Sequence, residues 1–125
     1  ILLVDMPPGS GLEVRGLLKI NLDAAVLVTS PQSISEAAVR KVVNMAEEYA
    51  IPVIGILENN AYRVAGTAGI RLSKDFQLVY LGKIGWSRTI VDKMESHEPF
   101  YSKTFDRVAK AISVYVNHRG SDGTA

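Results

Sequence analysis

Residues 24–57 read AAVLVTSPQSISEAAVRKVVNMAEEYAIPVIGIL, and this stretch decides the fold class of the chain. It opens and closes with short apolar runs rich in β-branched residues, at 24–29 and 52–57. Both runs are continuous rather than alternating, which is typical of strands that are covered on both faces of a parallel sheet. The segment between them has helical spacing. A strand, a helix and a second strand in this order predict a right-handed βαβ unit.

The helix of this unit is expected to begin at Ser33 and to end before Pro52. Ser33 and Glu36 have the spacing of a capping box, in which the hydroxyl and the carboxylate each bind an otherwise unpaired backbone N–H group. Apolar residues then recur at steps of three and four, so that one stripe is expected to face the sheet. The stripe consists of Ile34, Ala38, Val42, Met45 and Tyr49.

Three further segments complete the predicted fold. Apolar runs at residues 1–4 and 77–81 are expected to be strands, and residues 100–117 are expected to form a terminal helix that docks on the sheet. The fold class is therefore α/β, with an open, mostly parallel sheet and helices on both faces. We expect residues 1–118 to be the C-terminal part of an α/β domain and residues 119–125 to be a flexible tail.

Composition limits the kinds of function that the chain can have. The 125 residues are 47% hydrophobic and 22% charged, as in an ordinary soluble domain. A net charge of +1 gives no electrostatic footprint for nucleic acid or an anionic membrane, and no apolar run is long enough to span one. We expect a cytoplasmic protein. Because the chain has no cysteine, disulfides, thiolate zinc sites and a cysteine-held iron–sulfur cluster from this chain are excluded.

The chain also begins with Ile1 inside an expected strand rather than with a methionine. We expect it to be the downstream part of a longer protein.

In open parallel sheets, ligands bind beyond the carboxyl ends of the strands, so the residues that follow each apolar run are the candidates for function. The first run is followed by DMPPGSG at residues 5–11. The Asp5 carboxylate suits Mg²⁺, directly or through water, because this ion prefers oxygen ligands. The glycines let backbone N–H groups approach a phosphate. Alternatively, the aspartate and the Pro-Gly turn only close a strand.

The other strand ends carry polar residues as well. TSPQ follows the second run at residues 29–32, ENN follows the third at 58–60, and GKIGW follows the fourth at 82–86. The Asn59 amide matches the paired donor and acceptor of adenine, although a turn asparagine is an equally simple interpretation. Trp86 could stack on a base or pack against the edge of the core.

This ordered set of strand ends, over about residues 1–100, resembles the Mrp/MinD-like P-loop ATPases. The nearest branch is the Mrp type, which is associated with iron–sulfur cluster carriage. The resemblance implies that Asp5 is the Walker B aspartate and that residues 7–11 are the switch loop that senses the γ-phosphate. It also implies that Asn59 reads adenine and that a loop at residues 84–85 closes over the base. The implied site consists of Asp5 for catalysis and magnesium, and of Pro8, Gly9, Gly11, Asn59, Ile84 and Gly85 for the nucleotide.

The sequence departs from the family pattern in four places. The Walker A loop, G-x-x-x-x-G-K-[ST], is absent from the chain. Leu12 stands where the family has an acid after the switch glycine, and Glu13 follows one residue later. Trp86 stands where the base loop usually continues with a proline. Residues 60–69 contain no cysteine, whereas the Mrp branch has a Cys-x-x-Cys pair there.

The resemblance implies hydrolysis of ATP to ADP with Mg²⁺ in the complete protein, which is expected to be a homodimer. The chain alone is expected to be inactive. The alternatives are a non-catalytic α/β interaction module and a partition or division switch of the MinD/ParA type. His97 and His118 lie in polar surroundings and are interpreted as solvated side chains rather than as metal ligands.

Overall fold

The computed structural model of this chain describes residues 1–60, 63 and 65–121. It contains the three strands β1 (Ala25–Thr29), β2 (Val53–Asn60) and β3 (Tyr80–Gly85). The helices are α1 (Leu12–Leu18), α2 (Ser33–Glu48), α3 (Ala68–Asp75), α4 (Arg88–Glu95) and α5 (Lys103–Ser121).

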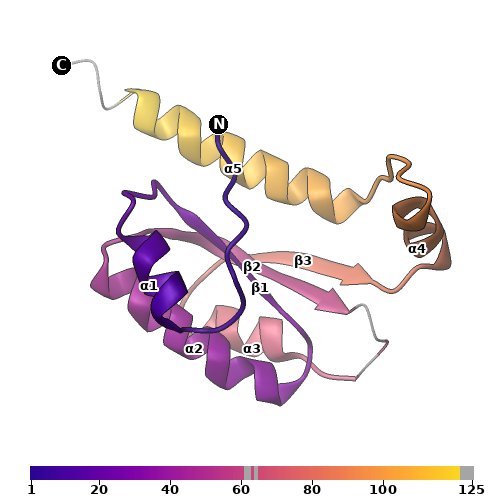
Figure 1. The fold of residues 1–125 in the computed structure, drawn as a ribbon, viewed down its shortest axis with the longest axis horizontal. Coiled ribbons are helices and arrows are strands. Elements are labelled where there is room, and N and C mark those ends of the chain that lie inside the picture. The colour runs from indigo at the N-terminus through magenta and orange to yellow at the C-terminus, as the bar shows by residue number, and fades with distance from the viewer. Residues whose placement is uncertain (61–62, 64, 122–125) are drawn as a thin grey trace.

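The strands form one parallel sheet in the order β1-β2-β3. Helices α2 and α3 cover one face of the sheet, and α5 crosses the opposite face (Figure 1). An open parallel sheet with helices on both faces is the α/β architecture that the sequence predicts, and this prediction is confirmed. No helix in the described part of the chain is long and apolar enough to cross a membrane.

The core lies mainly between the sheet and α2. One cluster joins α1 to the carboxyl half of α2, through Val14, Leu18, Met45, Ala46 and Ile51. The other joins the sheet to α2 and α3, through Leu27, Val39, Val43, Ile56 and Leu72. Strands β1 and β2 contribute to these clusters or pack against them, through Ala25, Leu27, Val53 and Ile56.

Helix α2 begins at Ser33 as predicted, but the capping box is wrong. Gln32 is the N-cap residue and makes no hydrogen bond with its side chain. Glu36 instead accepts two hydrogen bonds from Arg71 of α3, at 2.8 and 3.0 Å. A bidentate bond to a guanidinium is stronger than a bond from a backbone N–H group, so the tertiary contact takes the carboxylate.

The predicted apolar stripe of α2 is only partly right. Ile34 is 80% exposed, and Met45 is the one member of the predicted stripe that is fully buried. The buried face consists of Val39, Val43, Met45 and Ala46. Neighbouring rows of a helix have the same spacing, so the packing of α2 against the sheet and α1 decides which row is covered.

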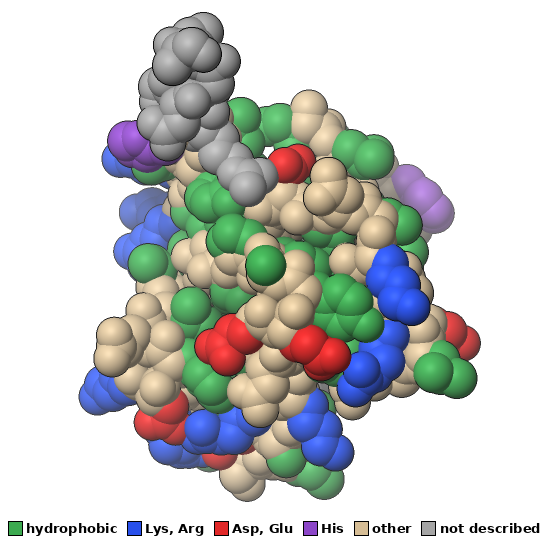
Figure 2. Space-filling model, turned by 90° about the vertical axis from the view of Figure 1, so that its left-hand side faces the viewer, with side chains coloured by type: hydrophobic (Ala, Val, Ile, Leu, Met, Phe, Trp, Pro, Cys, Tyr) green, Lys and Arg blue, Asp and Glu red, His purple; other side chains and the backbone are tan. Residues whose placement is uncertain are grey.

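The expected strand at residues 1–4 is wrong. This segment joins no strand (Figure 1), and Ile1, Leu2 and Leu3 are 89%, 86% and 76% exposed. A β-strand is stabilised by hydrogen bonds to a neighbouring strand, and no described strand pairs with residues 1–4. Figure 2 shows hydrophobic side chains that reach the surface across the middle of one face of the molecule.

The remaining segments differ from the prediction mainly at their boundaries. Strand β2 continues through Asn60, and β3 lies a few residues after the expected run at 77–81. Helix α5 continues to Ser121, three residues into the predicted tail. The rest of that tail, 122–125, lies outside the described residues.

Candidate functional site

The carboxyl ends of β2 and β3 bring three predicted site residues together. In the parallel register Asn59 pairs with Ile84, and Asn60 pairs with Gly85. The Asn59 side chain and Gly85 are exposed, and Ile84 is half-buried. The two strands thus present an amide, an apolar side chain and an open stretch of backbone at one edge of the sheet.

A second group of predicted site residues lies beside the end of β1. Asp5, Pro8 and Gly9 line a cavity of about 590 Å³ together with Thr29 and Ser30. Gly9 has a φ of 95°, in the left-handed region that favours glycine. The turn at Gly9 therefore has a conformation that a residue with a side chain rarely adopts.

Gly11 belongs to neither group. It is exposed, precedes α1 as the N-cap residue and does not line the cavity. Asn59, Ile84 and Gly85 do not line it either, so the predicted site residues fall into two groups. The cavity runs along β1 from Ala25 to Thr29, and Thr29 pairs with Glu58 of β2, the residue before Asn59.

The residues that line the cavity with Asp5 allow its predicted role in binding magnesium to be examined. Among the described residues, Asp5 is the only acidic one that lines the cavity, and the hydroxyl-bearing residues Thr29, Ser30 and Ser35 line it too. Among the described residues, no three His, Cys, Asp or Glu side chains are grouped as metal ligands. One carboxylate with hydroxyl oxygens fits Mg²⁺ that keeps most of its water and also binds a phosphate. It does not fit a metal ion that is enclosed by protein ligands.

Glu58 is a buried charged residue whose role the sequence did not indicate. Its side chain is 2% exposed and lies between α3 and β3. Burial and the charge of Glu58 raise the pKa of the neighbouring Tyr80 phenol. The sequence signal was a glutamate directly after an apolar run, which is also the pattern of an ordinary strand end.

Trp86 contacts a cation. The Arg63 guanidinium carbon lies 3.7 Å from the centre of the indole ring, a cation–π distance, and Trp86 is 37% exposed. This contact joins the segment after β2 to the segment after β3. Residues 61, 62 and 64 of the stretch that lacks the Cys-x-x-Cys pair lie outside the described residues.

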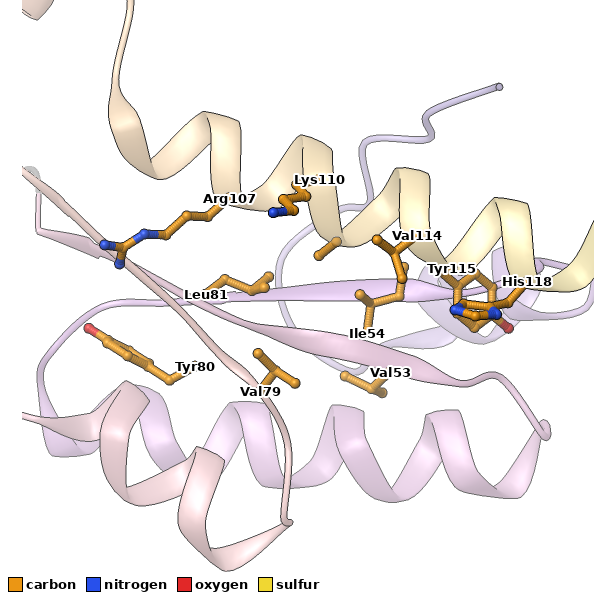
Figure 3. Close-up of a pocket in the computed structure, with 11 residues that line it drawn as sticks. Val53, Ile54, Val79, Tyr80, Leu81, Arg107, Lys110, Val114, Tyr115 and His118 are labelled. Atoms are coloured by element: carbon orange, nitrogen blue, oxygen red, sulfur yellow. The ribbon is translucent and has the colours of Figure 1, made fainter.

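A separate cavity of about 650 Å³ lies between α5 and the sheet. Its walls are mostly aliphatic, and Figure 3 shows Arg107 toward one end and His118 at the other. None of the predicted site residues lines this cavity. It lies on the face of the sheet opposite to α2 and α3. His97 is exposed and follows α4 in a turn with a φ of 57°.

Comparison with known proteins identifies the family of the chain. The family described as "ParA: NUBPL iron-transfer P-loop NTPase" matches residues 1–118. The chain is 31% identical over 99 residues to the iron-sulfur cluster carrier protein of Rickettsia felis, covering 78% of this chain and 31% of that protein. It is 30% identical over 138 residues to the protein of the same name from Aquifex aeolicus, covering 94% of this chain and 38% of that protein.

The chain thus spans about a third of the length of these relatives. The match extends over nearly the whole described structure, and the resemblance to the Mrp/MinD-like ATPases is confirmed. From its strand ends, its parallel sheet and these matches, the chain belongs to the NUBPL iron-transfer family of P-loop NTPases.

Proposed function

We propose that this chain supplies the switch segment and the base-reading segment of an ATP site, in a P-loop ATPase that takes part in iron–sulfur cluster carriage. The observation that supports this proposal is the position of Asn59, Ile84 and Gly85 at the carboxyl edge of the parallel sheet, where α/β proteins bind ligands. Asp5, Pro8 and Gly9 line a cavity that extends to Thr29 and Ser30, at the carboxyl end of the adjacent strand β1. The family and the names of the relatives support the cargo class.

In this proposal, the Asp5 carboxylate holds a water molecule of the magnesium ion. Mg²⁺, when bound with ATP, neutralises charge on the phosphates. Gly9 offers a backbone N–H group near the γ-phosphate, and Pro8, directly before it, restricts the conformation of the turn. The chain thus acts by positioning groups and by balancing charge during phosphoryl transfer.

The adenine base is proposed to contact residues at the carboxyl ends of β2 and β3. Asn59 donates and accepts hydrogen bonds at the edge of adenine, while Ile84 gives an apolar contact. Gly85 leaves the backbone open to the base because it has no side chain. The register that pairs Asn59 with Ile84 supports a joint role for these residues.

Asp5→Ala in the complete protein tests the switch segment. We expect ATP turnover to be lost while some nucleotide binding remains, because Asp5 acts on charge and position in the transition state. Asp92→Ala is the matched control, since Asp92 lies on α4 and pairs only with Arg88 in the described contacts. A wild-type rate in Asp5→Ala would remove Asp5 from the catalytic site, whereas an absence of turnover in the wild type would support a non-catalytic interaction module.

Asn59→Ala tests the base-reading segment. We expect the preference for ATP over GTP to fall by about 1–3 kcal/mol, the cost of an unsatisfied buried hydrogen bond. Asn44→Ala is the control, because Asn44 is exposed on α2, away from the strand ends. Unchanged selectivity in Asn59→Ala would remove Asn59 from the proposed site.

For the isolated chain we expect weak ATP binding and no hydrolysis. The sequence contains no G-x-x-x-x-G-K-[ST] loop, whose N–H groups and lysine are the main ligands of the phosphates. Calorimetric titration with Mg-ATP measures the affinity, and a micromolar dissociation constant would contradict this expectation.

The iron–sulfur cluster is proposed to be held elsewhere than on this chain. The 125 residues contain no cysteine, so they offer no thiolate to iron. After reconstitution with iron and sulfide, the isolated chain should show no visible absorption band. The complete protein is proposed to be a homodimer, which light scattering would test.

A further inference from the structure

Glu58 lies at the middle of the carboxyl edge, between the two neighbouring strands. Its side chain is 2% exposed, and it is the one carboxylate that is buried in the described part of the chain. A buried carboxylate is costly unless hydrogen bonds and opposite charge compensate for the lost water. Glu58 has both, because Oε2 accepts a hydrogen bond from the Gly69 N–H group at 3.1 Å and Oε1 lies 3.5 Å from Lys83 Nζ.

These two contacts connect separate elements. Gly69 is in the first turn of α3, whose N-cap residue Thr67 makes no capping hydrogen bond with its side chain. The Glu58 carboxylate therefore caps this helix from β2, where a negative charge also suits the helix dipole. A Cβ atom on Gly69 would lie 3.1 Å from Glu58 Oε2, so glycine permits the close approach. Lys83, at the other end of the ion pair, belongs to β3.

The ion pair directly precedes the proposed base-reading residues. Glu58 pairs with Lys83 in the sheet register, and the next pair is Asn59 with Ile84. Successive side chains of a strand point to opposite faces, so Glu58 does not share the face that Asn59 offers to a ligand. Beyond the strand ends, the same two segments meet again where Arg63 stacks on Trp86.

We propose that Glu58 is a positioning residue for the base side of the site, and that its contacts with Gly69 and Lys83 hold the segments after β2 and β3 together. The link to nucleotide binding rests on the proposed function. The contact that the positioning should maintain is that of Arg63 on Trp86.

The first experiment measures that contact in the isolated chain. Trp86 is the only tryptophan, so fluorescence quenching by neutral acrylamide reports on this one position. We expect Glu58→Gln to shift the Trp86 emission to the red and to increase quenching, because the ion pair with Lys83 is lost. Glu36→Gln is the matched control, since it breaks a different ion pair, with Arg71, which joins α2 to α3 and does not involve β2 or β3.

Lys83→Met is a second variant that keeps the Glu58 side chain. The Lys83 side chain is 40% exposed, so the substitution does not change the core. We expect it to increase Trp86 quenching as well, with the far-UV circular dichroism of the wild type. If quenching in both Glu58→Gln and Lys83→Met equals that of Glu36→Gln, Glu58 does not position these segments and the inference is overturned.

The second experiment uses the complete protein. We expect Glu58→Gln to weaken ATP binding by about tenfold, equivalent to about 1.4 kcal/mol, while turnover at saturating ATP stays near that of the wild type. An equal loss in turnover at saturation would contradict a positioning role for the base alone. Failure of the wild type to bind ATP would refute the proposed function, and the Trp86 measurement would still decide the role of Glu58.

Discussion

The segment at residues 52–60 and the segment at residues 1–11 have similar sequences and different structures. Each consists of an apolar run that is followed by polar residues at a predicted strand end. In β2, Ile56 is 0% exposed and lies between two paired strands, whereas Leu2 is 86% exposed and pairs with none. Apolar, β-branched residues thus permit a strand, but a neighbouring strand is needed to form one.

The largest expected effect is on stability, and it contrasts these two segments. Ile56→Ala should lower the free energy of unfolding by about 2–5 kcal/mol, because it leaves a cavity in the core that Ile56 forms with Leu27, Val43 and Leu72. Leu2→Ala should change it by less than about 0.5 kcal/mol, since the Leu2 side chain is exposed. Urea unfolding followed by circular dichroism measures both values.

Equal losses in the free energy of unfolding for Ile56→Ala and Leu2→Ala would contradict the difference between the two segments. A large cost for Leu2→Ala in the isolated chain would mean that residues 1–4 are packed in solution.

A smaller effect is expected at the carboxyl edge. Gly66 has a φ of 148°, and a Cβ atom there would lie 1.8 Å from the Pro31 carbonyl oxygen. Gly66→Ala should therefore destabilise the chain by about 1–3 kcal/mol. Gly11→Ala is the matched control, because no atom lies within 4 Å of its added Cβ. Thermal unfolding of both variants compares the tightly packed carboxyl edge at Gly66 with the open N-terminal segment at Gly11. Equal melting temperatures of the two variants would contradict this prediction.

The smallest effect concerns the Glu36 to Arg71 ion pair between α2 and α3. The hydrogen bonds and charge of Arg71 hold the pKa of Glu36 below its ordinary value. Because the folded pKa is the lower one, the stabilisation is complete above the ordinary carboxyl pKa of about 4.3 and is lost as the pH falls through the folded value. Glu36→Gln should therefore be slightly less stable than wild type at pH 7.

This difference should shrink as the pH falls below the ordinary carboxyl pKa of about 4.3, which urea midpoints at pH 7 and at acidic pH would show. Glu47→Gln, at an exposed position of the same helix, should show no such change. A constant difference at both pH values would mean that the ionised pair is not its cause.

Much of the fold could be predicted because it follows from local pattern. The runs at 24–29 and 52–57 became β1 and β2, and the helix between them begins at Ser33. The helices α1, α3 and α4 were not predicted. Each has only seven or eight residues, too few to show a clear helical periodicity. The capping box was wrong because Arg71, 35 residues away, binds Glu36.

The candidate site, like the fold, could be predicted only in part. The sequence by itself determined which residue types follow each strand, and therefore the family and the residues Asp5, Asn59, Ile84 and Gly85 as candidates. Only the tertiary structure decided that Asn59 lies beside Ile84, that Glu58 caps α3 while pairing with Lys83, and that residues 1–4 form no strand. The physical reason is that spacing along a chain fixes local conformation, whereas strand pairing and buried charge depend on partners that are distant in sequence.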